Sequence, residues 1–431
     1  MNFVIILAFV LVYYFGALKF FIGGDDFFLT VGGPHSLQEV LNQFVRPDQY
    51  RPIPYSILGA YTSLPHSTSL YHLISLITMS AVGYMLCKYM QSLGVKRLFA
   101  LGMSLVYLVS HIYFYTAYAL AGMVDLVFLL FFFATLLTFR QLYWLSLIMF
   151  IGAILSKEIF VSIPVILTME LWARRESKNW RRLLPYYLIT IVIMGLKFYF
   201  YKSAGEAYTY HISLPLLIEN LKHFALWLLN YRHGWQMGMP EPIGPEYVIP
   251  SAALFLAMTF AGISLWRSNQ RRFWFVVIFV LTGLVPFYFL SRVLVFYLNV
   301  SWVAVVTAVG LGLTYIAEDN DKGARALMAL ILFMAVLTSY QIRQQWLKYS
   351  FVAVAEETAS NFNKQVVQAN DWSQVDRLCL TKLDGDGAWA VAHGDAIKLM
   401  LANPPQVFVE NCNYDGGVVY QYEARGWQRV E

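Results

Sequence analysis

Two adjacent carboxylates are the first residues of this sequence whose types and spacing could carry acid–base chemistry. Asp25 and Asp26 lie in the segment GGDDFF, which directly follows an apolar stretch at residues 3–22. A carboxylate at the end of a membrane helix could deprotonate a nucleophile or hold a divalent cation, while its neighbour tunes its pKa. The alternative interpretation is a solvated turn that ends the helix.

Two cations lie in segments that could bind an anion such as a phosphate. Arg51 follows Tyr50 in the segment YRPIPY, where prolines stiffen the backbone and the guanidinium could bind phosphate in a forked geometry. Lys157 precedes Glu158 in the segment SKE, so the lysine could meet an anion that the glutamate helps to orient. The alternatives are a headgroup anchor for the arginine and a self-neutralising turn for the lysine–glutamate pair.

A third cation stands at the start of a late apolar run. Arg292 is the only basic residue between the two long apolar runs that flank it, and Tyr297 lies just over one helical turn later. A cation at this position runs against the distribution of basic residues in the other loops. This indicates either an anionic ligand or a lipid headgroup beside Arg292.

Three further residues are candidates for supporting roles. Asp125 lies inside an apolar run at 119–139, and a carboxylate in a membrane usually faces a polar cavity; the alternative is an acid at a helix start near the surface. Arg232 and His233 lie in the segment YRHGW, a cationic and aromatic cluster of the kind that can line a sugar or phosphate site. A lone histidine is more often structural.

Composition places these residues in a membrane protein. Of the 431 residues, 58% are hydrophobic and only 13% are charged, about half the charged fraction that is usual in globular proteins. The net charge of +5 is small and its basic residues occur in loops, so we predict no nucleic-acid partner. Cys379 and Cys412 could pair if the C-terminal tail faces an oxidising compartment.

The sequence has no motif for a metal or a nucleotide. No His, Cys and Asp cluster has the spacing of metal ligands, and there is no glycine-rich phosphate loop. The sequence therefore assigns no cofactor with certainty. A divalent cation held by Asp25 or Asp26 remains an open alternative. We therefore expect that an enzyme without a nucleotide-binding motif does not use a cytoplasmic nucleotide sugar as its donor.

Eleven apolar runs predict an all-α polytopic membrane protein with about eleven transmembrane helices, because only helices or closed barrels satisfy backbone groups in lipid. Every even-numbered run leads into a basic loop, which predicts a cytoplasmic N-terminus and an extracytoplasmic C-terminus. The runs are 3–22, 69–91, 98–116, 119–139, 141–156, 159–173, 183–201, 247–266, 273–290, 293–316 and 325–342.

The long polar segments then lie on the outer side. Two of them are loops, at 23–68 and 202–246, and the third is the tail at 343–431. The tail combines a helical segment at 349–368 with strand-like runs at 375–380 and 406–410. We therefore predict a transmembrane domain at 1–342 and a small soluble C-terminal α/β module at 343–431.

The ordered set of motifs resembles the GT-C glycosyltransferases. It is most similar to the O-mannosyltransferases that carry tetratricopeptide repeats and to their bacterial relatives. Those proteins share an acidic pair, a Tyr-Arg-Pro element, an Ala-Asp-Leu element and a Ser-Lys-Glu element, matched here by Asp25-Asp26, Tyr50-Arg51-Pro52, Val124-Asp125-Leu126 and Ser156-Lys157-Glu158. The family's Glu-Arg-Tyr-Leu-Tyr element is similar to Ser291-Arg292-Val293-Leu294-Val295, without the acid. The tetratricopeptide repeats are absent from this chain.

The resemblance implies a GT-C-like fold and an inverting sugar transfer on the outer side of a bacterial inner membrane. The donor would be a polyprenyl-phosphate sugar held among membrane lipids, and the acceptor a glycan, a lipid or a protein. Asp25 or Asp26 would be the base, with Asp25 favoured, and Lys157, Arg292 and Arg51 would bind the donor phosphate.

Two other function classes remain open from the sequence. A transporter or flippase of a lipid-linked sugar would carry out no chemistry, and it would more typically show internal repeats and midplane polar residues. A polysaccharide ligase or polymerase would use a pyrophosphate-linked donor. The ionisable residues gather at one predicted face, which favours surface chemistry over transport.

Overall fold

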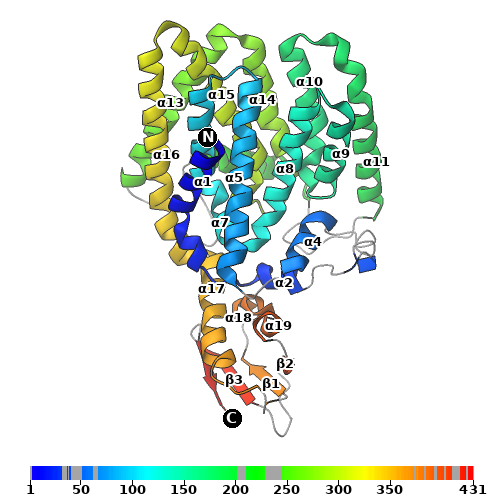
Figure 1. Cartoon of the computed structure of the whole chain (residues 1–431), viewed down its shortest axis with the longest axis vertical. Helices are drawn as coiled ribbons and strands as arrows, with labels where there is room; N and C mark the ends of the chain where they lie inside the picture. Colours follow the sequence, from blue (N-terminus) through cyan, green and yellow to red (C-terminus); the bar gives the residue numbers. More distant parts are fainter. Residues whose placement is uncertain are drawn as a thin grey trace.

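Long apolar helices form the body of the protein in the computed structural model (Figure 1). The structure describes residues 2–31, 36, 38–39, 51–61, 67–200, 210–228, 245–372, 375, 377–382, 385–392, 396–401, 404–409, 418–423 and 426–430. Within these residues, six helices are long and apolar enough to cross a membrane, or seven when the bent pair at 97–118 counts as one span. The chain is therefore a mostly helical, multi-pass membrane protein.

The helices of the bundle lie between residues 2 and 349. Their bounds are α1 Asn2–Tyr13, α5 Thr68–Ser92, α6 Arg97–Val109, α7 Phe114–Tyr118, α8 Met123–Thr138, α9 Tyr143–Ile154, α10 Ser162–Arg174, α11 Leu184–Phe200, α12 Leu214–Leu228, α13 Pro245–Ser268, α14 Gln270–Leu284, α15 Asn299–Asp319 and α16 Asp321–Tyr349. Two short helices, α2 Asp25–Val31 and α4 Pro52–Ala60, lie at the end of the bundle from which the C-terminal segment emerges (Figure 1).

The predicted count of eleven full spans is matched only in part. The other four predicted runs form α1, α9, α10 and α11, which have 12, 12, 13 and 17 residues. At about 1.5 Å per residue these helices reach roughly 18–26 Å, less than the hydrocarbon thickness of about 30 Å. Apolar residues continue beyond the helix ends into 3₁₀ turns, such as Phe15–Lys19 after α1. A hydropathy pattern therefore does not separate a helix from the apolar turn that follows it, and the predicted run is longer than the helix.

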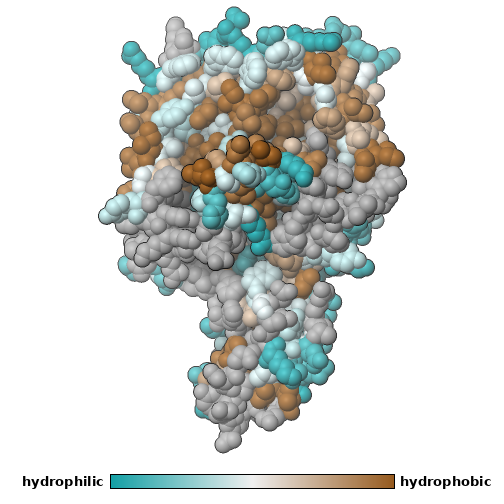
Figure 2. Space-filling view, turned by 180° about the vertical axis from the view of Figure 1, so that it is seen from behind, coloured by the Kyte–Doolittle hydropathy of each residue, from teal (hydrophilic) through white to brown (hydrophobic). Residues whose placement is uncertain are grey.

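The basic loops meet at one end of the bundle, here called the basic end. Figure 2 shows hydrophilic residues along this rim above a band of apolar ones. Contacts between loops that are distant in sequence hold the rim together: Arg174 to the Ser92 carbonyl at 2.7 Å, Arg140 to Glu176 at 2.5 Å, Lys96 to the Ala317 carbonyl at 3.2 Å, and Arg272 to the Tyr315 hydroxyl at 3.3 Å. The alternation of basic loops along the sequence thus corresponds to a shared position in space.

A small sheet follows the last long helix. After Ser350 caps the next helix, α17 Phe351–Phe362 leads into a four-stranded mixed sheet of order β2-β1-β3-β4. The strands are β1 Arg377–Thr381, β2 Gln406–Val409, β3 Val418–Glu423 and β4 Gly426–Arg429, with β1 parallel to β2 and β3, and β4 antiparallel to β3. The predicted helical segment and strand-like runs of the tail are confirmed.

The sheet packs against α17 through aromatic side chains. The Trp427 ring lies 4.9 Å from that of Phe362, and its indole N–H donates to the Thr358 carbonyl at 3.3 Å. We call residues 351–431 the C-terminal module, and the end of the bundle beside it the module end. Cys379 on β1 is disulfide-bonded and Cys87 is free, whereas Cys412 lies outside the described residues.

Candidate active site

Asp26 is the buried member of the acidic pair. It is 2% exposed, and its Oδ1 accepts a hydrogen bond from the Ala121 N–H at 2.8 Å, in the 3₁₀ turn that precedes α8. Burial raises the pKa of Asp26 to about 7, against the opposing effect of the Ala121 and Leu120 N–H groups. This carboxylate ties the acidic segment to the bundle and is almost shielded from solvent.

Asp25 is the accessible member of the pair. It is half-buried, and its Oδ1 accepts a hydrogen bond from the indole N–H of Trp389 at 3.0 Å. The Tyr115 hydroxyl also donates to it. Burial raises the pKa of Asp25, and the hydrogen bonds from Trp389 and Tyr115 oppose that effect. A raised pKa moves a carboxylate toward the range in which it acts well as a general base near neutral pH.

Lys157 and Asp125 form a buried ion pair at the module end. Their side chains are each only 5% exposed, and the Lys157 ammonium contacts Asp125 Oδ1. The same oxygen accepts a hydrogen bond from Asn299 Nδ2 at 2.7 Å. Lys157 lies in the turn after α9 and Asn299 begins α15, so three separate segments supply this cluster.

Arg51 and Glu158 form a second, more accessible ion pair. The Arg51 Nη2 lies 2.9 Å from Glu158 Oε2 and its Nε lies 3.3 Å from Oε1, which is the forked geometry of an arginine–carboxylate pair. The two side chains are 23% and 34% exposed. A backbone hydrogen bond of 3.3 Å from Ile53 to Leu155 holds α4 against the turn that carries Glu158.

Asp25 and the two ion pairs are connected through a shared neighbour, the Tyr55 hydroxyl of α4. The charges of Asp125, Arg51 and Glu158 all act on Lys157. The charges of Arg51, Glu158 and Asp25 all act on the Tyr55 hydroxyl of α4. The structure therefore brings together Asp25, Arg51, Asp125, Lys157 and Glu158, which the sequence singled out on separate segments.

Two aromatic rings lie beside the Lys157 ammonium. The ammonium lies 5.5 Å from the centre of the Phe296 ring and 5.8 Å from that of Tyr297, distances typical of cation–π contacts. The Phe296 ring stacks on Tyr115 at 4.5 Å. Tyr297 thus lies beside Lys157, on the segment before α15, and its supporting role stays a prediction.

Arg292 has an exposed side chain in the connection between α14 and α15. Residues from the second long loop pack beside this connection: Asn220 of α12 donates to the Leu290 carbonyl at 3.1 Å, and the His211 N–H donates to the Phe289 carbonyl at 2.9 Å. Tyr50, Arg232 and His233 lie outside the described residues, so their predicted roles stay predictions.

Four residues of the site were missed by sequence reasoning. Three of them are aromatic: Tyr55, Tyr115 and Trp389. Because 17% of the chain is aromatic, the residue type alone did not distinguish these three from other aromatic residues. Asn299 did carry one, because it is a polar side chain near the start of an apolar run, where polar residues mark interior contacts. Among the described residues, no three His, Cys, Asp or Glu side chains gather closely enough to hold a metal ion.

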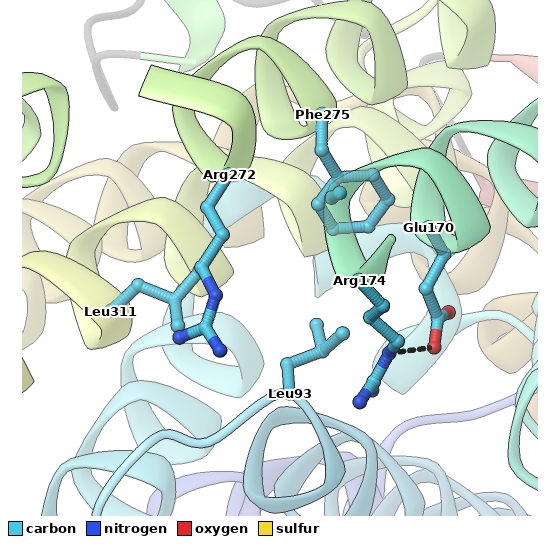
Figure 3. Close-up of a pocket in the computed structure, with 7 residues that line it drawn as sticks. Leu93, Glu170, Arg174, Arg272, Phe275 and Leu311 are labelled. Atoms are coloured by element: carbon cyan, nitrogen blue, oxygen red, sulfur yellow. Dashed lines mark hydrogen bonds and ion pairs between the residues drawn. The ribbon is translucent and has the colours of Figure 1, made fainter. Parts of the chain in front are cut away.

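A separate pocket lies at the basic end, away from the acidic pair (Figure 3). Figure 3 shows Arg174 and Arg272 directed toward it from α10 and α14, with Leu93 between them and Arg174 bonded to Glu170 at 2.9 Å. Because Arg174 already has a carboxylate partner and the Arg272 guanidinium bonds to Tyr315, the groups at this pocket serve the packing of the rim.

No protein-family model matches the chain, and no curated protein matches it.

Proposed function

We propose that the protein is an inverting glycosyltransferase that moves a hexose from a polyprenyl-phosphate donor to an acceptor hydroxyl on the extracytoplasmic side of the membrane. The observation that carries the proposal is the convergence of a half-buried carboxylate, two cation–carboxylate pairs and aromatic rings at one end of a membrane bundle. Such an end is where a lipid-borne phosphate and a soluble hydroxyl can meet.

The chemistry assigned to these groups is a single displacement. The Asp25 carboxylate takes the proton of the acceptor hydroxyl, whose oxygen forms a bond to the anomeric carbon. The bond from that carbon to the phosphate oxygen breaks, and the polyprenyl phosphate leaves with the bonding electrons. Cations stabilise the charge that develops on the leaving phosphate. One displacement inverts the anomeric configuration and forms no covalent sugar–enzyme intermediate.

The two ion pairs suit different parts of that task. Arg51 and Glu158 are partly exposed, so a phosphate can replace or join the glutamate at the guanidinium. Lys157 is buried on Asp125, and it contributes a positive charge held in place beneath the phosphate. Arg292 is the exposed cation on the connection that leads to Tyr297. We therefore assign direct phosphate contact to Arg51 and Arg292 and an indirect role to Lys157.

Lipid that copurifies with the protein tests the donor assignment. We expect mass spectrometry to find a polyprenyl phosphate or its sugar ester with the parent protein. Arg51→Ala and Arg292→Ala should each reduce its affinity about tenfold, because each removes a charged hydrogen bond to phosphate. Arg325→Ala at the basic end, whose guanidinium pairs with Asp321, is the matched control. Equal lipid in all variants would place the phosphate elsewhere.

The proposed site requires the module end to face away from the cytoplasm. The basic loops at the opposite end support this orientation by the positive-inside rule, and the disulfide at Cys379 fits an oxidising compartment. Eleven crossings, with the short helices α1, α9, α10 and α11 included, would give the same result. We expect an alkaline phosphatase fused after Glu431 to be active and a cytoplasmic fluorescent protein at that position to be dark. The reverse pattern would refute the orientation.

A further inference from the structure

The C-terminal module contacts the acidic segment directly. The Phe21 N–H donates to Glu356 Oε1 of α17 at 3.1 Å, and the Gly24 N–H donates to the Ala390 carbonyl at 3.0 Å. Trp389, which lies with Ala390 on the short helix α18 Gly385–Ala390, donates to Asp25. The segment that carries the acidic pair is therefore held by the module on one side and by Ala121 of the bundle on the other.

The two glycines before the acidic pair are explained by this packing. A Cβ on Gly23 would lie 2.7 Å from the Ala355 carbonyl oxygen, and one on Gly24 would lie 2.4 Å from the Trp389 ring. Gly24 also has a φ of +58°, in the left-handed region that favours glycine. The sequence Gly23-Gly24 thus permits a close approach between the acidic segment and the module, which brings the indole to the carboxylate.

Trp389 is held in this position by its own neighbours. Its ring lies 5.4 Å from Phe351 at the start of α17, and the Phe351 ring lies 6.5 Å from Tyr115. Because Tyr115 also donates to Asp25, two donors from distant parts of the chain orient one carboxylate. An indole N–H can only donate, so this contact always presents a donor to the carboxylate and leaves its remaining lone pairs for an acceptor hydroxyl.

We infer that Trp389 is a positioning residue of the active site, and that the C-terminal module completes the site by orienting the Asp25 carboxylate toward the acceptor. This inference rests on the proposed function, since it assigns a role in the same reaction. Among the described residues, the titratable groups around Asp25 are Asp26 on its own helix, Tyr115 of α7 and Tyr55 of α4, and Glu356 of α17 lies against the same segment.

Trp389→Phe tests the inference, because phenylalanine keeps an aromatic ring beside Phe351 and removes the donor. We expect the turnover number, followed as release of polyprenyl phosphate from a polyprenyl-phosphate hexose, to fall roughly 10- to 100-fold, with KM for the donor within about twofold of the parent. Trp427→Phe is the matched control, since it removes an indole N–H of the same module that donates to the Thr358 carbonyl. It should keep parental turnover.

A spectroscopic measurement separates this inference from the proposed function. With 5-fluorotryptophan incorporated into the full chain, the ¹⁹F signal assigned by its loss in Trp389→Phe should move in Asp25→Asn and stay in place in Glu158→Gln. A signal that does not respond to Asp25→Asn, or equal turnover losses in Trp389→Phe and Trp427→Phe, would overturn the inference. A responsive signal in a protein that transfers no sugar would refute the proposed function while retaining the contact.

Discussion

Asp25→Asn is expected to lower the rate of sugar transfer by about 10²–10⁴-fold while donor binding stays at the parental level. An amide of the same size can still accept the indole hydrogen bond of Trp389, so the acidic segment should keep its structure. It cannot take a proton from the acceptor hydroxyl. The measurement is release of polyprenyl phosphate at saturating donor, with donor binding determined in parallel.

Asp26→Asn is the matched control for this prediction. Asp26 is buried and bonded to the Ala121 N–H, a contact that an amide oxygen can also accept, so its rate should stay within about tenfold of the parent. The pH profile gives a second check. Burial raises the pKa of Asp25, and the base must be ionised to accept a proton. On the acid side of a plot of turnover number against pH, the midpoint should therefore lie above about 3.9, the ordinary pKa of an aspartate. A parental rate in Asp25→Asn would leave the acidic pair with a structural role alone at the start of α2.

Lys157→Met is expected to destabilise the folded protein by about 3–5 kcal/mol, the usual cost of removing one partner from a buried ion pair. The variant leaves the Asp125 carboxylate buried with only the Asn299 amide as a described hydrogen-bond donor. Thermal unfolding of the purified protein in detergent measures the loss. Lys96→Met is the control, because its ammonium bonds to the Ala317 carbonyl at the basic end and its loss should cost about 1 kcal/mol or less.

The double variant Lys157→Met with Asp125→Leu separates stability from function. Replacing both charges by apolar side chains of similar size removes the unpaired carboxylate, so most of the lost stability should return. Under the proposed function, donor binding and sugar transfer should stay low, because the ammonium that is proposed to act on the donor phosphate is absent. Parental transfer by a stable double variant would show that the ion pair serves folding alone.

The position of the site at one end of the bundle could be predicted from the sequence. Asp25 and Lys157 each lie beside the end of an apolar run, and Arg51 lies in the long loop between two runs. The alternation of basic loops assigns all three residues to the face opposite the basic loops. The contacts across the basic end show that such loops do meet in space. The same logic located the helical and strand segments of the tail, because their patterns are local.

The partners within the site could not be predicted in the same way. Which carboxylate pairs with Lys157 depends on how α8, α9 and α15 are arranged, and hydropathy carries no information on that arrangement. Trp389 lies 364 residues after Asp25. Its hydrogen bond to Asp25 depends on where the end of α16 places the C-terminal module. The helices α1 and α9 are shorter than the apolar runs that predicted them, because apolar residues continue through the turns that end them.

One reaction tests the central claim most directly. Purified protein is incubated with polyprenyl-phosphate hexoses labelled with ¹³C at the anomeric carbon, together with membranes of the source organism as the acceptor. We predict release of free polyprenyl phosphate and a new glycoside of inverted anomeric configuration, both absent with Asp25→Asn. Intact donor that is bound or moved across a vesicle membrane without release of polyprenyl phosphate would contradict a glycosyltransferase and indicate a transporter.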